Sequence, residues 1–175
     1  MNNLFILVVL LLLISCSGNN ENILNIPEYE GPISEVYDAT HYYSDSAVVK
    51  LKIETPVQWD FENGDQEFPE GIFIEFFDNL GQTTNTLRAD HCKYTFEDKV
   101  YKATGNVVMK GIKTNEQLNT EELFWDMDKE RVYTDKFVMI ETENQIVKGN
   151  GLESNQDFTE WEIKNSVGTI SLDDK

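Results

Sequence analysis

Hydrophobic residues recur at every second position through the central and C-terminal parts of the chain. Ile72, Ile74 and Phe76 share one face of a predicted strand, and Leu51 and Ile53 share one face of an earlier strand. Because successive side chains of a strand point to opposite faces, this spacing predicts strands with a buried face. No comparable stretch has the spacing of an amphipathic helix, so the sequence predicts an all-β protein.

A weak internal repeat of roughly 30 residues is visible when the segments that begin at Leu87, Leu118 and Val147 are aligned. The first two segments place an acidic residue three positions after the leucine and an aromatic residue, Tyr94 or Trp125, seven positions after it. Repeats of a few short strands and a polar turn suit a β-solenoid or an open roll whose units stack edge to edge. An ordinary β-sandwich, whose hairpins resemble one another, is the alternative.

The N-terminus has the pattern of a lipoprotein signal peptide. Residues 4–14 form an uninterrupted apolar run that is too short to span a bilayer core of about 30 Å as a helix. Ser15 and Cys16 follow, in the order of the bacterial lipobox, where the cysteine is acylated before cleavage. We therefore expect residues 1–15 to be removed and Cys16 to hold the protein to a membrane through its acyl chains. A short transmembrane anchor with an incidental cysteine is the alternative.

The rest of the chain divides into a polar tether with two prolines, residues 16–32, and one domain, residues 33–175. The chain has 14 Lys and Arg against 32 Asp and Glu, a formal net charge of −18. Such a surface repels nucleic acid and anionic headgroups, so we expect no nucleic-acid binding and attachment to the membrane through lipid alone. Cys92, the second cysteine, is expected to be a buried core thiol.

No group of residues points to catalysis. His41 and His91 fall in predicted strands, and His91 should point away from its neighbour Cys92 because adjacent strand residues face opposite sides. Asp126 and Asp128 share a strand face but lack the ligand series of a calcium loop, so we expect a solvated acidic edge. The sequence therefore predicts a protein that is not an enzyme, with no cofactor and no metal site.

Five segments stand in a distinctive order and spacing: residues 87–90, 105–107, 118–126, 132–135 and 147–152. Together they resemble the LptC family, the periplasmic component of the lipopolysaccharide export machine, over roughly residues 36–170. The resemblance implies a twisted, open-sided antiparallel β-jellyroll, the fold that LptC shares with the bridge protein LptA. The better-known family members are held by a transmembrane helix, so a lipid anchor at Cys16 departs from their pattern.

Ten Phe, seven Tyr and three Trp are enough either for a packed core or for a groove that holds acyl chains. Both arrangements place apolar residues at alternate positions, so the spacing does not separate them. The LptC resemblance favours a groove. The candidate lining residues are the same-face strand residues Leu51, Ile53, Ile74, Phe76, Tyr94, Phe96, Leu123, Trp125, Val138, Ile140, Phe158 and Trp161.

By resemblance, the protein is a lipid-anchored periplasmic subunit that receives lipopolysaccharide from an inner-membrane ABC transporter and passes it to an LptA-like bridge protein. Strands near residues 36–43 and 161–172 are expected at opposite ends of the roll, where unpaired edges pair readily with another chain. The N-terminal edge should face the transporter subunits and the C-terminal edge the bridge protein. Because the domain is acidic, the burial of acyl chains must supply the affinity for lipopolysaccharide.

A glycan-binding surface lipoprotein with a β-sandwich fold is the rival interpretation, in which exposed aromatic residues would form a flat platform. The location also has two alternatives. Ser17 after Cys16 favours the outer membrane under the sorting rule of enteric bacteria, whereas the LptC resemblance requires the periplasmic face of the inner membrane. We predict the inner membrane.

Overall fold

The computed structural model describes residues 29–172. The predicted signal peptide 1–15, Cys16 and most of the tether lie outside the described residues. The described elements are all β-strands, which confirms the predicted class. They are β1 (Ser34–Asp45), β2 (Val48–Asp60), β3 (Gln66–Phe68), β4 (Ile72–Phe77), β5 (Thr83–Ala89), β6 (His91–Thr95), β7 (Val100–Gly111), β8 (Gln117–Asp126), β9 (Arg131–Glu141), β10 (Gln145–Asn155) and β11 (Trp161–Ser171).

The strands form a single antiparallel sheet that divides into two arms. The first part of β2 pairs with β4 through residues 51–54, and its last part pairs with β3 through residues 59–60. In the same way, residues 100–104 of β7 pair with β6, and residues 108–111 pair with β5. The long strands therefore run from a β3–β6 arm, which contains β3 and β6, into a β4–β5 arm, which contains β4 and β5.

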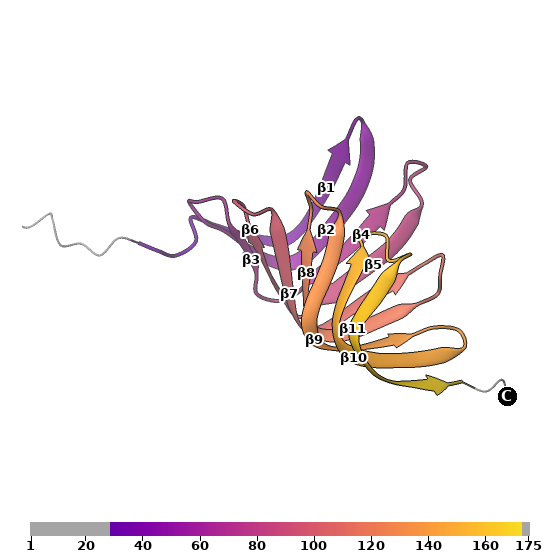
Figure 1. Ribbon diagram of the computed structural model, residues 1–175. Helices are drawn as coiled ribbons and strands as arrows, with labels where there is room; N and C mark the ends of the chain where they lie inside the picture. Colours follow the sequence, from indigo (N-terminus) through magenta and orange to yellow (C-terminus); the bar gives the residue numbers. More distant parts are fainter. Residues whose placement is uncertain (1–28, 173–175) are drawn as a thin grey trace, which may run out of the picture. The chain divides into compact units, whose positions relative to one another are not determined.

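The bend between the arms is built from bulges in the long strands. In β7, Gly105 and Asn106 have positive φ angles of 74° and 46°, and the register with β8 shifts between Thr104 and Val107. In β10, Gly151 has a φ of 78°, and the register with β9 shifts between Asn150 and Leu152. A bulge kinks a strand and increases its twist, so the sheet folds along this line (Figure 1).

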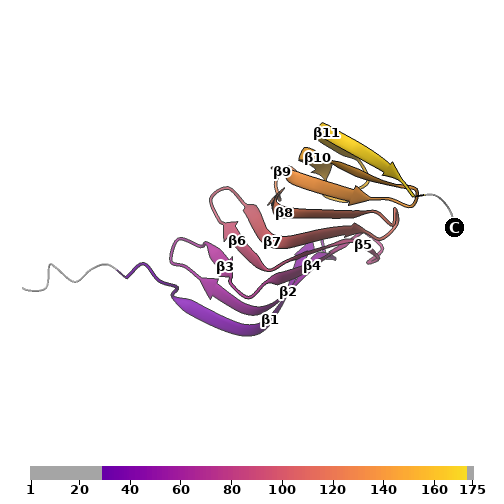
Figure 2. The ribbon, with the colours of Figure 1, turned by 90° about the horizontal axis from the view of Figure 1, so that it is seen from below.

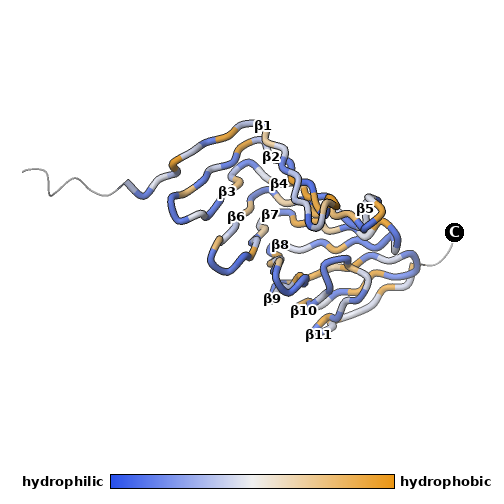
Figure 3. The backbone as a smooth tube through the Cα atoms, turned by 90° about the horizontal axis from the view of Figure 1, so that it is seen from above, coloured by the Kyte–Doolittle hydropathy of each residue, from blue (hydrophilic) through white to orange (hydrophobic). Residues whose placement is uncertain are grey.

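The hydrophobic core lies between the two arms. The exposure of β4 alternates strictly, with Ile72, Ile74 and Phe76 buried, and Figure 3 shows hydrophobic and hydrophilic residues alternating along the strands. Phe68 and Cys92 enter this core from the β3–β6 arm. One sheet folded on itself, rather than two separate sheets of a sandwich, encloses the core, as expected for the open antiparallel β-jellyroll.

The internal repeat corresponds to single crossings of the bend. Leu87 and Leu118 lie on the β4–β5 arm, whereas Tyr94 and Trp125 lie on the β3–β6 arm. The first crossing is split between β5 and β6, and the second is made by β8 alone. The length of the repeat is therefore the length of chain that passes from one arm to the other and back.

Two strands form the free edges of the sheet. Within the described residues, β1 pairs only with β2, and β11 pairs only with β10. Figure 2 shows β1 and β11 at opposite ends of the sheet. Both strands pair along nearly their whole length on one side, so each presents a long row of backbone donors and acceptors on its other side.

Candidate functional site

An open cleft of about 710 Å³ lies between the ends of the two arms and extends from β1 and β2 to the loop between β10 and β11. Tyr43 and Leu51 line it from the β4–β5 arm, and Tyr94 and Trp125 line it from the β3–β6 arm. Gln156, in the loop between β10 and β11, lies at its end. Sites of roughly 300–1,000 Å³ hold ligands of small-molecule or cofactor size, so the cleft is large enough for part of a lipid.

Aromatic rings form a continuous wall behind this cleft. The ring centroids of Tyr94 and Tyr101 are 4.6 Å apart, and those of Tyr101 and Trp125 are 4.9 Å apart. Phe76, from the opposite arm, meets Trp125 edge-on at 5.0 Å. Burial raises the pKa of the Tyr101 hydroxyl well above its usual range. The wall is therefore neutral and apolar at physiological pH.

The β10–β11 loop, residues 156–160, closes the interior on the β11 side. Phe158 is fully buried in the core. Asn85 Nδ2 donates a hydrogen bond of 2.9 Å to the backbone oxygen of Gln156, and Trp125 Nε1 donates one of 2.8 Å to Gln156 Oε1. Gln156 N in turn donates to the Glu130 oxygen at 2.8 Å. The interior is thus open near β1 and closed near β11.

The entrance to the cleft is acidic. Lys99 pairs with Asp128 at 2.9 Å, and the hydrogen bond with Asp128 raises the pKa of Lys99. Lys50 donates to the side chain of Asn79. Further carboxylates line the cleft at Asp45, Asp78, Glu130 and Asp157. Carboxylates therefore outnumber cations, and a negatively charged head group gains little attraction at this entrance.

The structure brings all of the candidate groove residues except Phe96 to the interior. Nine are buried in the core: Leu51, Ile53, Ile74, Phe76, Leu123, Trp125, Val138, Ile140 and Phe158. Tyr94 and Trp161 are half-buried against it. Phe96 follows the end of β6, where its side chain is 59% exposed. Of the set, Leu51, Tyr94 and Trp125 line the open cleft.

Sequence reasoning did not single out two residues of the site. Tyr43 lines the cleft from the edge strand β1, and Gln156 bonds to both arms. In the sequence, Tyr43 cannot be told from any other exposed tyrosine of a strand. A glutamine in a polar turn, such as Gln156, is not recognisable as a binding residue from the sequence. Both positions depend on contacts between segments far apart in the chain.

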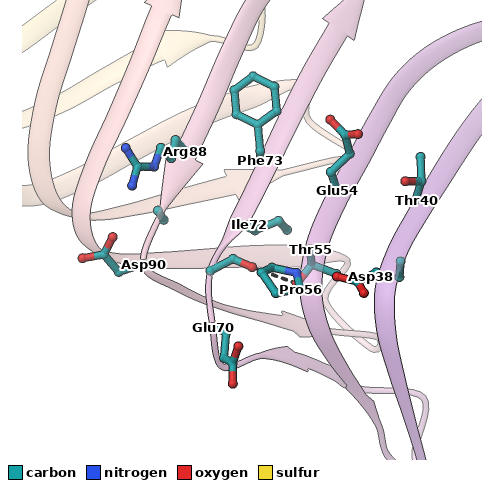
Figure 4. A pocket seen from close by; sticks show the side chains of 13 residues that line it. Asp38, Thr40, Glu54, Thr55, Pro56, Glu70, Ile72, Phe73, Arg88 and Asp90 are labelled. Atoms are coloured by element: carbon teal, nitrogen blue, oxygen red, sulfur yellow. Dashed lines mark hydrogen bonds between the residues drawn. The ribbon is translucent and has the colours of Figure 1, made fainter.

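A second cavity, of about 570 Å³, lies beside the middle of β1 and β2, at the start of β4 and the end of β5 (Figure 4). Glu54, Phe73 and Arg88 project from its sides, next in sequence to the inward-facing Ile53, Ile74 and Leu87, so this cavity opens on the outer face. Four carboxylates line it against the single Arg88: Asp38, Glu54, Glu70 and Asp90.

The cysteine, histidine and aspartate side chains that were candidates for chemistry have structural roles. Cys92 is buried in the core as predicted, and burial raises its pKa to about 12, which keeps the thiol protonated and unreactive. His91 points away from the core, with Nε2 2.8 Å from Glu67 Oε1. The predicted solvated edge at Asp126 is wrong for that residue, because its carboxylate is buried and accepts hydrogen bonds from Lys129.

Comparison with known proteins identifies the family. Residues 29–172 contain no helix with the length and hydrophobicity needed to cross a bilayer. No curated protein matches the chain. A family model described as lipopolysaccharide-assembly, LptC-related, matches residues 6–172. Proteins of this family are periplasmic components of lipopolysaccharide transport that are associated with the inner membrane. With a match over nearly its whole length and the open jellyroll that this family is expected to have, the chain belongs to the LptC-related family.

Proposed function

We propose that this protein carries lipopolysaccharide with its acyl chains between the two arms of the sheet, receiving it from an inner-membrane ABC transporter and passing it to an LptA-like bridge protein. The observation that carries the proposal is the open cleft beside β1, with its wall of aromatic rings. Burying apolar area yields about 25 cal/mol per Å², so several acyl chains supply ample free energy without any charged contact.

The acidic entrance indicates which part of lipopolysaccharide enters the cleft. Phosphates of lipopolysaccharide stay outside the cleft, because the carboxylates around Lys50 and Lys99 disfavour a buried anion. Weak attraction for the head group allows the lipid to move on, since the protein does not hold it by strong ionic contacts. The outer cavity suits the ligand less well, because four carboxylates surround its only cation, Arg88.

The two free edges fit the proposed partners. On β1, Tyr37 and Tyr42 are 64% and 63% exposed, and on β11, Val167 is 64% exposed. An exposed edge strand with apolar side chains is a template for pairing with another chain. We assign β1 to the transporter and β11 to the bridge protein. Acylation at Cys16 would keep the domain near the transporter, at the periplasmic face of the inner membrane.

Photocrosslinking tests the lipid site. Benzoylphenylalanine at Tyr43 or Tyr94 should crosslink to lipopolysaccharide, because both side chains line the cleft. The same probe at Phe96, which is on the same arm but exposed beyond the end of β6, is the matched control and should give background signal. Equal labelling at Phe96 and Tyr94 would show unspecific association. Undiminished competition by a fully deacylated saccharide would support the glycan-binding alternative instead.

Paired edge variants test the order of partners. Lysine at Tyr37 and Tyr42 places charges on β1, and lysine at Val167 and Ile170 does the same on β11. Charged side chains on an edge oppose pairing with another chain. The β1 variant should lose copurification with the transporter and keep the bridge protein, and the β11 variant should do the reverse. Loss of both partners in each variant would contradict the assignment.

A further inference from the structure

The β10–β11 loop occupies the interior instead of merely covering it. Phe158 is fully buried, and a side-chain carbon added at Gly111 of β7 would lie 3.7 Å from its ring. Gly111 belongs to the β4–β5 arm, whereas the loop extends from the β3–β6 arm. The phenyl ring therefore fills the space between the arms through which an acyl chain would pass from the cleft toward β11.

The loop has a rigid internal structure. Asn155 Oδ1 accepts hydrogen bonds from the backbone nitrogens of Thr159 and Glu160, at 3.0 and 3.1 Å. Asn155 Nδ2 donates to Thr159 Oγ1 at 2.8 Å. Phe158 has a positive φ of 51°, which an L-residue adopts only when its surroundings compensate. These bonds join the loop to Asn155, the last residue of β10, so the loop keeps them if it moves together with the end of that strand.

Apart from the apolar packing of Phe158 in the core, the contacts of the loop with the arms are a few hydrogen bonds. They are the bonds from Asn85 and Trp125 to Gln156, and the bond from Gln156 N to Glu130. Beside the loop, Trp161 Nε1 donates to Glu116 Oε2 at 3.0 Å and ties β11 to the turn before β8. The two interior groups that face the loop, Asn85 Nδ2 and Trp125 Nε1, are both donors. A molecule that replaces Gln156 must therefore offer two acceptors.

We infer that the β10–β11 loop is displaced by lipid, and that ester or amide carbonyl oxygens of the incoming acyl chains replace Gln156 as acceptors for Asn85 and Trp125. This rests on the proposed function. Acyl chains of a glycolipid carry such carbonyls at the point where the apolar chain meets the polar head, which matches the place of these donors between the apolar core and the cleft. Displacement then opens the interior as far as β11, the edge from which the lipid leaves.

The indole signals of the three tryptophans report on displacement of the β10–β11 loop. Trp125 Nε1 bonds to the loop and Trp161 Nε1 bonds beside it, whereas Trp59 Nε1 bonds to Glu35 on the edge strand β1. In a ¹⁵N-labelled full chain in nonionic detergent, addition of lipid A should shift the indole signals of Trp125 and Trp161. The signal of Trp59 serves as the internal control and should stay in place, as should all three signals when detergent alone is added.

Two variants and one ligand analogue sharpen this test. Gln156→Ala removes one side-chain acceptor without removing Phe158, and it should tighten binding of lipid A by roughly tenfold, about the effect of one buried hydrogen bond. Glu160→Gln, on the exposed side of the same loop, should bind as the parent does. An ether-linked analogue of lipid A, which lacks acyl carbonyls, should bind the parent protein roughly tenfold more weakly.

The outcomes separate this inference from the function on which it rests. Because Trp125 also lines the cleft, the signal of Trp161 decides. If lipid A crosslinks at Tyr94 while the Trp161 signal stays at its unliganded position, displacement of the loop is contradicted, whereas the acyl site in the cleft is supported. If the signals shift but the ether analogue binds equally well, the carbonyl assignment is overturned. If no crosslink forms at Tyr94, the proposed function itself fails.

Discussion

Phe76 of β4 meets the indole of Trp125 of β8 edge-on, with ring centroids 5.0 Å apart, and this contact joins the two arms of the sheet beside the cleft. Both side chains are about 1% exposed. An edge-to-face pair adds about 0.5–1.5 kcal/mol beyond the area that it buries. The pair thus contributes to the stability of the domain and to the spacing between the arms where the lipid is proposed to enter.

Truncation of this pair should cost stability in a coupled way. Phe76→Ala and Trp125→Ala should each lower the free energy of unfolding by about 3–5 kcal/mol, and the double variant by less than their sum. Urea denaturation followed by circular dichroism gives these values. The stacked pair Phe124 and Tyr133, 5.2 Å apart and half-exposed, is the control, and Phe124→Ala should cost less. Full additivity at Phe76 and Trp125 would show that the arms are not coupled there.

Asp126 should make the domain sensitive to acid. Hydrogen bonds from the side chain and backbone of Lys129 lower the pKa of this carboxyl. A pKa that is lower in the folded state contributes stability above the unfolded value of about 4, and this stability is lost as the pH falls through the folded value.

Asp126→Asn removes this contribution, so it should destabilise the protein at pH 7 by roughly 1–3 kcal/mol. The effect should shrink as the pH falls below about 4. Thermal unfolding of both proteins, followed from pH 7 to well below the unfolded pKa of about 4, measures it. Asp128→Asn breaks an exposed ion pair with Lys99 and should change stability by about 1 kcal/mol or less. If the effect of Asp126→Asn on stability does not vary with pH, the lowered pKa of Asp126 does not contribute to stability, and the prediction is wrong.

Cys16 should be the site of membrane attachment. Cys16→Ser should abolish incorporation of a labelled fatty acid and leave the protein either unprocessed or released in soluble form. Metabolic labelling followed by fractionation of cells measures both effects. Cys92→Ser is the control, since the buried thiol should carry no acyl chain and the variant should still be labelled. Continued labelling of Cys16→Ser would refute the lipobox assignment.

Binding of lipid A should become stronger with ionic strength. The cleft entrance and the chain as a whole are acidic, so added salt screens repulsion of the phosphates. We expect affinity to rise between about 10 mM and 100 mM salt, over which the Debye length falls from roughly 30 Å to 10 Å. Fluorescence titration measures the change, with an uncharged single-chain lipid as the control that should show little effect. Weaker binding at high salt would point to a cationic site for the phosphates.

Alternation along single strands is enough to predict the class of the fold and the buried face of several strands. Period-two alternation is local, because neighbouring side chains of a strand must point to opposite sides, so the burial of Leu51 and Ile53 opposite Lys50 and Lys52 follows from spacing alone. In β4, where Phe73 and Phe77 make the other face apolar as well, spacing alone does not choose the buried face. The same reasoning placed Cys92 in the core and His91 outside it. Chain order also indicated β1 and β11 as the two edges, because consecutive strands of a roll are usually neighbours.

Which part of the inner face stays open depends instead on how the two arms pack together. The sequence predicts both Phe158 and Tyr94 on the inner face of strands, but Phe158 is fully buried in the β10–β11 loop, outside any strand, while Tyr94 of β6 lines the cleft. Phe96 lies just beyond the strand in which the pattern placed it. The difference is set by the bends that bring the arms together and by contacts such as Asn85 to Gln156, which joins residues 71 positions apart. Such contacts depend on the path of the whole chain, whereas alternation depends only on the backbone of each strand.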